Sequence, residues 1–369
     1  MKQLVTDSIQ LRSGLSLKNR LAIAPMTTRM SYYDGTVTGD EINYYGSRTG
    51  DVGLFITGVA YIKPNGIGWT GELGIHDDSC IPGLSKLAAR IKENGTRAIL
   101  QMFHAGRMTD SKTTGGLPIV GPSAVPGIRP GQETPQALSN EEIEEIINDF
   151  KAATVRAIKA GFDGIEIHGA NQFLLHQFFS PHANQRTDKW GGSIEKRYTF
   201  IETVVDEVLA TVKESGVKEF AVGYRFSPRE ESTPGFNLKE TLWLVDKLAD
   251  KELDYLHVSM THYDGKTNIP GYEEKTMLQY IHETINGRLP LISVGHIHTE
   301  EDVTEALEDS EMAAVASAIL LDPKWAWKIL NGKADTIRHT MNAVDRDSLQ
   351  ISNGAFEFLA WINPDKVTL

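Results

Sequence analysis

The chain has 369 residues, of which 40% are hydrophobic, so it is long enough to form one large α/β barrel or two ordinary domains around a buried core. It carries 37 Lys and Arg against 49 Asp and Glu, a formal net charge of −12, and so acidic a chain gains no counterion-release affinity from a nucleic-acid backbone. Cys80 is the only cysteine and no apolar run approaches the roughly 18 residues that cross a bilayer, so we expect a cytoplasmic protein without an internal disulfide, a nucleic-acid partner or a membrane partner.

Short runs of β-branched residues alternate with longer segments of helical periodicity along the whole chain. The expected strands are Arg20–Pro25, Gly53–Thr57, Ala98–Phe103, Gly164–His168, Phe220–Phe226, Tyr255–Ser259, Leu289–Val294 and Ala313–Ala318. One helical segment, Ser139–Ala160, begins with a capping box of Ser139 and Glu142 and ends at Gly161, and another, Leu238–Lys251, precedes the sixth strand. Strands that alternate with helices in this number predict a (β/α)8 TIM barrel, whose chemistry lies at the C-terminal ends of the strands.

The connection after the third expected strand departs from the simple repeat. Leu117–Ala137 carries five prolines and is too long and too proline-rich for a plain strand-to-helix loop. It is either a surface excursion or a lid over the mouth of the barrel. No stretch has the composition of a linker, so the sequence predicts one α/β domain over residues 1–369, a (β/α)8 barrel with a lid-like excursion after strand 3.

The segment Gly66–Gly71 has the spacing GxGxxG, which occurs in dinucleotide-binding folds. That motif needs a strand directly before it and a helix that opens within it. Here Lys63, Pro64 and Asn65 intervene, and the residues that follow read as a loop. We therefore predict that the match is accidental and that a nicotinamide nucleotide would not bind in a Rossmann pocket.

The segment Gly164–Arg197 is the most informative part of the chain. A buried strand ends at His168, and Asn171 follows three residues later. Two hydrogen-bonding side chains at this spacing past a strand can converge on one carbonyl oxygen. A run of turn-forming and charged residues comes next: Ser180-Pro181, Asn184, Arg186, Asp188, Gly191-Gly192-Ser193 and Arg197.

This segment resembles the signature of the Old Yellow Enzyme family, the FMN-dependent NAD(P)H oxidoreductases built on a TIM barrel. The resemblance implies FMN as cofactor, NADH or NADPH as electron donor and a small-molecule acceptor. It implies that His168 and Asn171 bind the substrate carbonyl, that the run from Ser180 to Arg197 braces the loop beneath them, and that the excursion is a lid. The oligomeric state stays open, and a homo-oligomer is compatible with this resemblance.

Other strand ends match the family's flavin-binding positions. The first strand ends in Pro25, Met26 and Thr27, and the resemblance implies that Thr27 hydrogen-bonds the flavin near its redox-active edge. Gln101, in a stretch similar to the family's Q-L-x-H-x-G-R, would pair with the pyrimidine edge. Arg225 would stabilise the anion that forms when the flavin is reduced. At the second strand, Val59 replaces a smaller residue and would act through its backbone.

Phe173 is the first important departure from the family. The family usually has a tyrosine two residues after the Asn, where it is the expected proton donor in the reduction of activated alkenes. Phe173 has no transferable proton, so general-acid help of roughly 10²–10⁴ is lost if alkenes are substrates. Quinones, nitro compounds and free flavins take up protons on heteroatoms. The sequence therefore favours these acceptors over activated alkenes.

The second departure is at the expected phosphate site after strands seven and eight. The family has Gly-Gly and Gly-Arg there, and this chain has Gly295-His296 and Ala316-Ser317. Backbone N–H groups of both loops can still bind a phosphate. Loss of the arginine predicts FMN binding about 10–100 times weaker than in relatives, with partial compensation from His296 and Ser317.

Two other classes remain to be weighed. A non-catalytic flavin- or ligand-binding barrel is compatible with the missing tyrosine and arginine. A metal-dependent barrel hydrolase would need ligands from His168, His176 and His182, or from His296 and His298. These spacings are not a known ligand pattern and no acidic cluster accompanies them, so we predict no metal site.

Overall fold

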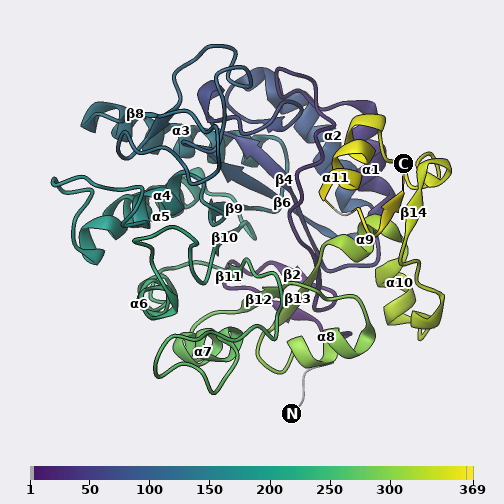
Figure 1. Cartoon of the computed structure of the whole chain (residues 1–369). Coiled ribbons are helices and arrows are strands. Elements are labelled where there is room, and N and C mark those ends of the chain that lie inside the picture. Colours follow the sequence, from purple (N-terminus) through teal and green to yellow (C-terminus); the bar gives the residue numbers. More distant parts are fainter. Residues whose placement is uncertain (1–3, 363, 369) are drawn as a thin grey trace.

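The computed structural model describes residues 4–362 and 364–368, and its centre is a closed ring of parallel strands (Figure 1). The ring closes because the first strand pairs in parallel with both the second and the last. The predicted (β/α)8 barrel is thereby confirmed. In ring order from the first, the strands are β3 (Leu21–Ile23), β4 (Leu54–Tyr61), β6 (Arg97–Phe103), β9 (Gly164–Gly169), β10 (Ala221–Phe226), β11 (Tyr255–Val258), β12 (Leu291–Val294) and β13 (Met312–Val315).

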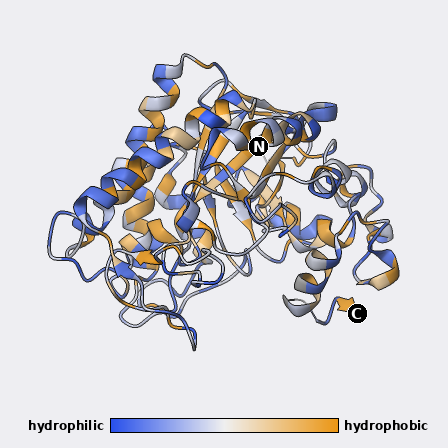
Figure 2. Ribbon diagram, turned by 90° about the horizontal axis from the view of Figure 1, so that it is seen from above, coloured by the Kyte–Doolittle hydropathy of each residue, from blue (hydrophilic) through white to orange (hydrophobic). Residues whose placement is uncertain are grey.

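Helices surround this ring and present apolar faces to it, so hydrophobic residues gather on the central strands while the outer helices carry both kinds (Figure 2). The expected capping box of Ser139 and Glu142 is present at the start of the third helix. No described helix combines the length and the hydrophobicity needed to cross a bilayer. The helices are α1 (Gly39–Arg48), α2 (Ile81–Lys92), α3 (Asn140–Lys159), α4 (Leu174–Phe179), α5 (Ile194–Ser215), α6 (Leu238–Ala249), α7 (Met277–Ile285), α8 (Glu300–Ala306), α9 (Ser317–Leu321), α10 (Trp325–Leu330) and α11 (Asn353–Ile362).

Short elements close the ends of the barrel and decorate its loops. An N-terminal hairpin supplies Leu11, Leu15 and Leu17 to the apolar cluster that fills the barrel interior. The C-terminal helix α11 lies near α1, on the side of the barrel where the chain ends (Figure 1). The short strands are β1 (Ile9–Gln10), β2 (Ser16–Leu17), β5 (Leu73–Gly74), β7 (Val120–Gly121), β8 (Gln136–Ala137), β14 (Met341–Asn342) and β15 (Val367–Thr368), and the 3-10 turns are η1 (Pro64–Gly66), η2 (Asp78–Cys80), η3 (Glu93–Gly95), η4 (Ala334–Thr336) and η5 (Ala343–Asp345).

Several strand ends at the mouth of the barrel differ from expectation by one or two residues, and those of β4 and β13 differ most. Strand β4 runs on to Tyr61, with a shift of register between Ile56 and Val59, so Val59 lies within the strand. The last strand was expected to reach Ala318 but ends at Val315, because Ala316 leaves the extended conformation and α9 begins at the next residue. Ala316 and Ser317 therefore lie on a turn at the strand end, where they can face a ligand.

The segment with the GxGxxG spacing shares only Gly66 with the 3-10 turn η1, and its other residues form a loop in which no α-helix begins. Its backbone binds a buried carboxyl group: the amides of Gly68 and Trp69 donate hydrogen bonds to Glu72 Oε2 at 2.7 and 3.1 Å. The prediction that this match is accidental is confirmed.

The excursion between residues 117 and 137 is tied to the segments that follow β6 and β9. Within it β7 and β8 form a two-residue parallel ladder. Arg107 donates to the carbonyl oxygens of Val125 and Pro126, both at 3.0 Å, and Arg186 donates to that of Pro122 at 3.1 Å. The excursion is thus anchored at several points along its length.

Candidate active site at the barrel mouth

Residues of the signature segment brace the loop that follows β9. Asn184 donates through its amide to the carbonyl oxygens of Phe178 and Trp190, both at 2.7 Å. Arg197 donates to Phe179 at 2.7 Å. A Cβ at Gly191 would lie 2.5 Å from Asn184 Oδ1, so this close approach requires glycine. These contacts give a physical basis for the bracing that the sequence resemblance implied.

His168 is placed as a hydrogen-bond donor at the end of β9. Its side chain is buried, and its Nδ1 accepts from the Ala170 amide at 3.2 Å. Burial, and then the nearby positive charge of Arg225, holds the pKa of His168 well below its ordinary value, so the ring is neutral. A neutral ring that accepts at Nδ1 carries its proton on Nε2. His168 therefore offers an N–H to a ligand.

Asn171 follows three residues later and has a left-handed backbone conformation, with φ of 56°. Its backbone amide donates to Ser227 Oγ at 2.9 Å, and its side-chain oxygen accepts from Ser259 Oγ at 3.0 Å. The amide oxygen is thereby engaged, and the side-chain nitrogen is the group left to donate. His168 and Asn171 are thus two donors at one strand end, and two donors of this kind are able to bind a carbonyl oxygen.

Phe173 forms an apolar wall next to these donors. Its ring meets His168 edge to face at 4.9 Å between centroids and Phe103 at 5.0 Å. Trp69 approaches it at 6.1 Å, and the side chain of Val59 belongs to the same cluster. The position that would carry the family's tyrosine hydroxyl is therefore occupied by hydrocarbon.

A buried polar network lies one layer below His168 in the barrel. Glu166 is fully buried and accepts from Gln101 Nε2 at 2.6 Å and from His257 Nδ1 at 2.9 Å. The carboxylate dictates the orientation of the Gln101 amide, because the opposite orientation would place two oxygens against each other. Sequence reasoning missed Glu166 and His257, whose partners become neighbours only through the strand register.

Arg225 links this network to Asn171 through the hydroxyl of Ser259. On strand β10, Arg225 lies opposite His168 of β9 and His257 of β11. Its guanidinium donates to Ser259 Oγ at 3.1 Å. Burial lowers the pKa of Arg225, but an arginine remains charged in proteins. The network therefore places one fixed positive charge beneath the mouth of the barrel.

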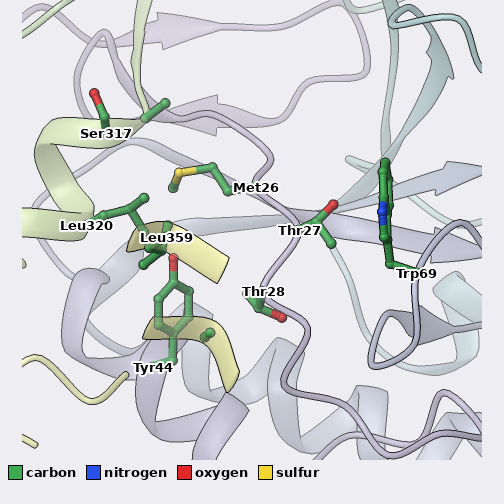
Figure 3. A pocket seen from close by; sticks show the side chains of 10 residues that line it. Met26, Thr27, Thr28, Tyr44, Trp69, Ser317, Leu320 and Leu359 are labelled. Carbon is green, nitrogen blue, oxygen red and sulfur yellow. The ribbon is translucent and has the colours of Figure 1, made fainter. Parts of the chain in front are cut away.

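Met26 and Thr27, at the end of the first strand, line a cavity of about 340 Å³ (Figure 3). The cavity brings them together with the strand-eight turn of Ala316 and Ser317. Pro25, the preceding residue, is half-buried and is not among the lining residues. The other lining residues are Thr28, Tyr44, Trp69, Leu320, Ala355 and Leu359.

The turn after β12 contains Gly295 and His296. Gly295 has φ of 121°, and a Cβ there would lie 2.6 Å from the Met260 carbonyl oxygen, so the position requires glycine. The ring of His296 lies 4.7 Å from those of both His262 and His298. His262 and His298 were missed by sequence reasoning, since one lies on another loop and the other was considered only as a metal ligand.

Of the histidines weighed as metal ligands, His296 and His298 are neighbours, whereas His176 and His182 have different partners. His176 lies 3.5 Å from Glu230, while His182 lies 3.2 Å from Arg107. Within residues 4–362 and 364–368, no group of three His, Cys, Asp or Glu side chains is arranged to hold a metal ion.

Two buried carboxyl groups support the loops around the mouth and give the protein a pH-dependent stability. Glu41 accepts from the hydroxyls of Thr28 and Ser31 at 2.7 and 2.6 Å, and burial raises its pKa to about 7. Burial also raises the pKa of Glu72, to about 8. Both groups favour folding while protonated, so their contribution is complete below pH 4.5 and is lost as the pH rises through 7 to 8.

We therefore expect Glu41→Gln and Glu72→Gln each to reduce the loss of unfolding free energy between pH 5 and 8.5, by roughly 1–3 kcal/mol. Urea unfolding at the two pH values measures this difference. The exposed Glu300 provides the control, because Glu300→Gln should leave the pH dependence as it is. Parallel pH profiles for the wild type and both buried variants would contradict the assignment.

The comparisons with known proteins point to oxidoreductases. The family described as NADH:flavin oxidoreductase / NADH oxidase matches residues 7–336. The probable NADH-dependent flavin oxidoreductase YqiG of Bacillus subtilis (strain 168) is 42% identical over 94% of this chain and 92% of its own. NADH:acrylate oxidoreductase of Vibrio harveyi is 40% identical over 99% of this chain, which spans only 36% of that longer protein. Among solved structures, morphinone reductase has a TM-score of 0.79 and 26% identity, with 96% of this chain and 94% of that one covered.

Proposed function

Because the chain belongs to the NADH:flavin oxidoreductase / NADH oxidase family, and is therefore an NAD(P)H-dependent flavin oxidoreductase that uses FMN, we propose that it carries electrons to a small electron-poor acceptor through one shared site. The shared site is the pair of His168 and Asn171. Membership of this enzyme family sets aside both the non-catalytic barrel and the metal-dependent hydrolase.

The residues at the mouth fit FMN. Gln101 Oε1 and Arg225 Nε are buried polar atoms without a hydrogen-bond partner among the described residues. An acceptor and a charged donor left unpaired in this way are costly unless a bound group completes them. The pyrimidine edge of a flavin offers an N–H and carbonyl oxygens that complement them. Gly295, Ser317 and the backbone of their turns would hold the phosphate.

Each residue has a distinct role in this proposal. FMN, when bound, supplies the chemistry of taking a hydride from NADH or NADPH and giving it to the acceptor. His168 and Asn171 donate to the carboxamide oxygen of the nicotinamide and later to an oxygen of the acceptor. Arg225 contributes positive charge where negative charge accumulates. Gln101 and Thr27 orient the cofactor, with Thr27 near its reactive edge.

Sharing one pair of donors has a kinetic consequence. NAD(P)H and the electron acceptor cannot occupy His168 and Asn171 at the same time. They therefore bind in turn, and the enzyme follows a ping-pong mechanism. Initial rates over a grid of NADH and menadione concentrations should give parallel double-reciprocal lines. Intersecting lines would mean that both substrates are bound together, and the shared site would then be wrong.

Phe173 narrows the proposed acceptor class. Reduction of an activated alkene requires a proton on carbon, and the apolar wall of Phe173, Phe103 and Trp69 offers none. Quinones, nitro compounds and free flavins accept protons on oxygen or nitrogen from water. We therefore assign these acceptors a higher turnover than alkenes.

The matching prediction concerns Phe173→Tyr. A hydroxyl at this position adds a general acid, and we expect turnover with 2-cyclohexenone to rise by about 10- to 100-fold. Turnover with menadione should change less than two-fold, because a quinone does not need this proton. If turnover rises by the same factor with both acceptors, or does not rise with 2-cyclohexenone, then the side chain at position 173 does not decide the acceptor class.

A further inference from the structure

A second cavity, of about 470 Å³, opens beside Asn171 on the far side of the carbonyl-binding pair from the cavity of Met26 and Thr27. The excursion contributes Arg129 to it, and the segments after β9, β10 and β11, with one residue each of α4 and α7, contribute the rest. Its volume falls in the range of about 300–1,000 Å³ found for ligand pockets. The two serines that position Asn171, Ser227 and Ser259, belong to its lining, so the cavity is continuous with the candidate site.

The charge of this cavity is positive, in contrast to that of the whole chain. Arg129, Arg229 and Lys266 are exposed and line it, and none of them forms an ion pair with an acidic side chain among the described residues. Lys266 donates to the carbonyl oxygen of Glu274 at 3.1 Å, which orients its ammonium group without neutralising it. Three cations in one cavity therefore remain available to an anion.

The acidic residues of the same cavity do not cancel this charge. Glu230 points inward: its side chain is 1% exposed, accepts from the Phe236 amide at 3.0 Å and lies 3.5 Å from His176. Glu231 is the exposed carboxylate that remains. By comparison, the cavity of Met26 and Thr27 is lined by apolar and uncharged polar side chains alone. The positive side of the mouth is thus the side of Asn171.

We propose that this cavity binds the diphosphate of the nicotinamide dinucleotide while its carboxamide is held by His168 and Asn171. This inference rests on the proposed function. A dinucleotide whose nicotinamide lies over the mouth must extend beyond the pair, and the positive cavity adjoins Asn171. The diphosphate carries two negative charges, and guanidinium groups bind phosphate oxygens with paired hydrogen bonds. Arg129 belongs to the excursion, so the excursion supplies one of the three cations that face the diphosphate.

The test compares two electron donors that share the reacting ring. NADH contains the diphosphate, whereas N-benzyl-1,4-dihydronicotinamide has the same carboxamide and hydride but no phosphate. In the double variant Arg229→Ala/Lys266→Ala, with menadione as uncharged acceptor, we expect the KM for NADH to rise about 10- to 100-fold, since two charge-assisted contacts are lost. The KM for the benzyl compound should change less than two-fold. Arg129→Ala should show the same selectivity with a smaller effect.

Lys112→Ala is the matched control, because Lys112 is an exposed cation just before the excursion and outside the cavity. It removes one charge and should leave both KM values unchanged. The KM for NADH should also increase with ionic strength in the wild type, and this dependence should be weaker in the double variant.

Three results would overturn the proposal. An equal rise in KM for NADH and for the benzyl compound would mean that the cations support the fold or the binding of the nicotinamide ring. Unchanged KM values for both would place the diphosphate elsewhere. A rise in the KM of an anionic acceptor such as fumarate, with NADH unaffected, would make this an acceptor site. Failure of the proposed function is distinct, because then neither donor would reduce the flavin of the unaltered enzyme.

Discussion

The variant His168→Ala should lower kcat/KM for NADH by about 100- to 1,000-fold and still bind FMN. The reason lies in the state of this side chain, which is buried, neutral and turned so that Nε2 donates. Its removal leaves one donor on the nicotinamide carboxamide, so the reacting carbon is no longer held in position. Stopped-flow measurement of flavin bleaching by NADH gives the rate, and the visible spectrum gives the FMN content.

Asn171→Ala is the companion variant. It removes the second donor, and we expect a loss in the same parameter and in the same direction. Both variants should also weaken the binding of the electron acceptor, because the acceptor and NADH share this pair of residues. Loss of FMN from His168→Ala, with normal folding by circular dichroism, would contradict the assignment and would make His168 a cofactor ligand instead.

Replacing the buried charge should shift the reduction potential of the bound flavin in opposite directions in two variants. Arg225→Gln removes a positive charge and makes the potential more negative, whereas Glu166→Gln removes the negative charge from the same network and makes it more positive. For a two-electron couple about 30 mV corresponds to 1.4 kcal/mol, and we expect shifts of ~30–60 mV. Reduction by NADH should slow in Arg225→Gln accordingly.

Dye-equilibrated titration of each variant measures these potentials. Lys112→Ala, which removes an exposed charge away from the site, serves as the comparison and should leave the potential unchanged. Shifts of the same sign in both charge variants would mean that general disruption of the site, and not the charge, controls the potential. No shift in Arg225→Gln would remove this residue from the electrostatic role proposed for it.

Much of the fold could be predicted from the sequence because its signals are local. The β-branched runs locate all eight barrel strands, and Ser139 with Glu142 marks the start of α3. The loop of His168 and Asn171 could be found because strand, turn and donors lie within a few residues. The end of the last strand could not be predicted to the residue, since small and apolar residues continue without a break from the strand into α9.

The remainder of the site depends on contacts between distant segments. Glu166 meets Gln101 and His257 only because three strands align in register, and no spacing in the sequence records this. His262 joins His296 across two loops. The positive cavity is assembled in the same way, from residues more than 130 positions apart. Registers and loop contacts of this kind require the three-dimensional structure.

The most direct test of the account is an anaerobic visible-absorbance titration of the purified protein, supplied with FMN, against NADH. We predict a bound-flavin spectrum that bleaches as NADH is added and returns when menadione is supplied. Titration of the FMN-free protein with FMN gives the affinity for the cofactor, expected to be about 10–100 times weaker than in relatives that keep the strand-eight arginine. A bound flavin that neither NADH nor NADPH bleaches, or a protein that binds no FMN, would contradict the central claim.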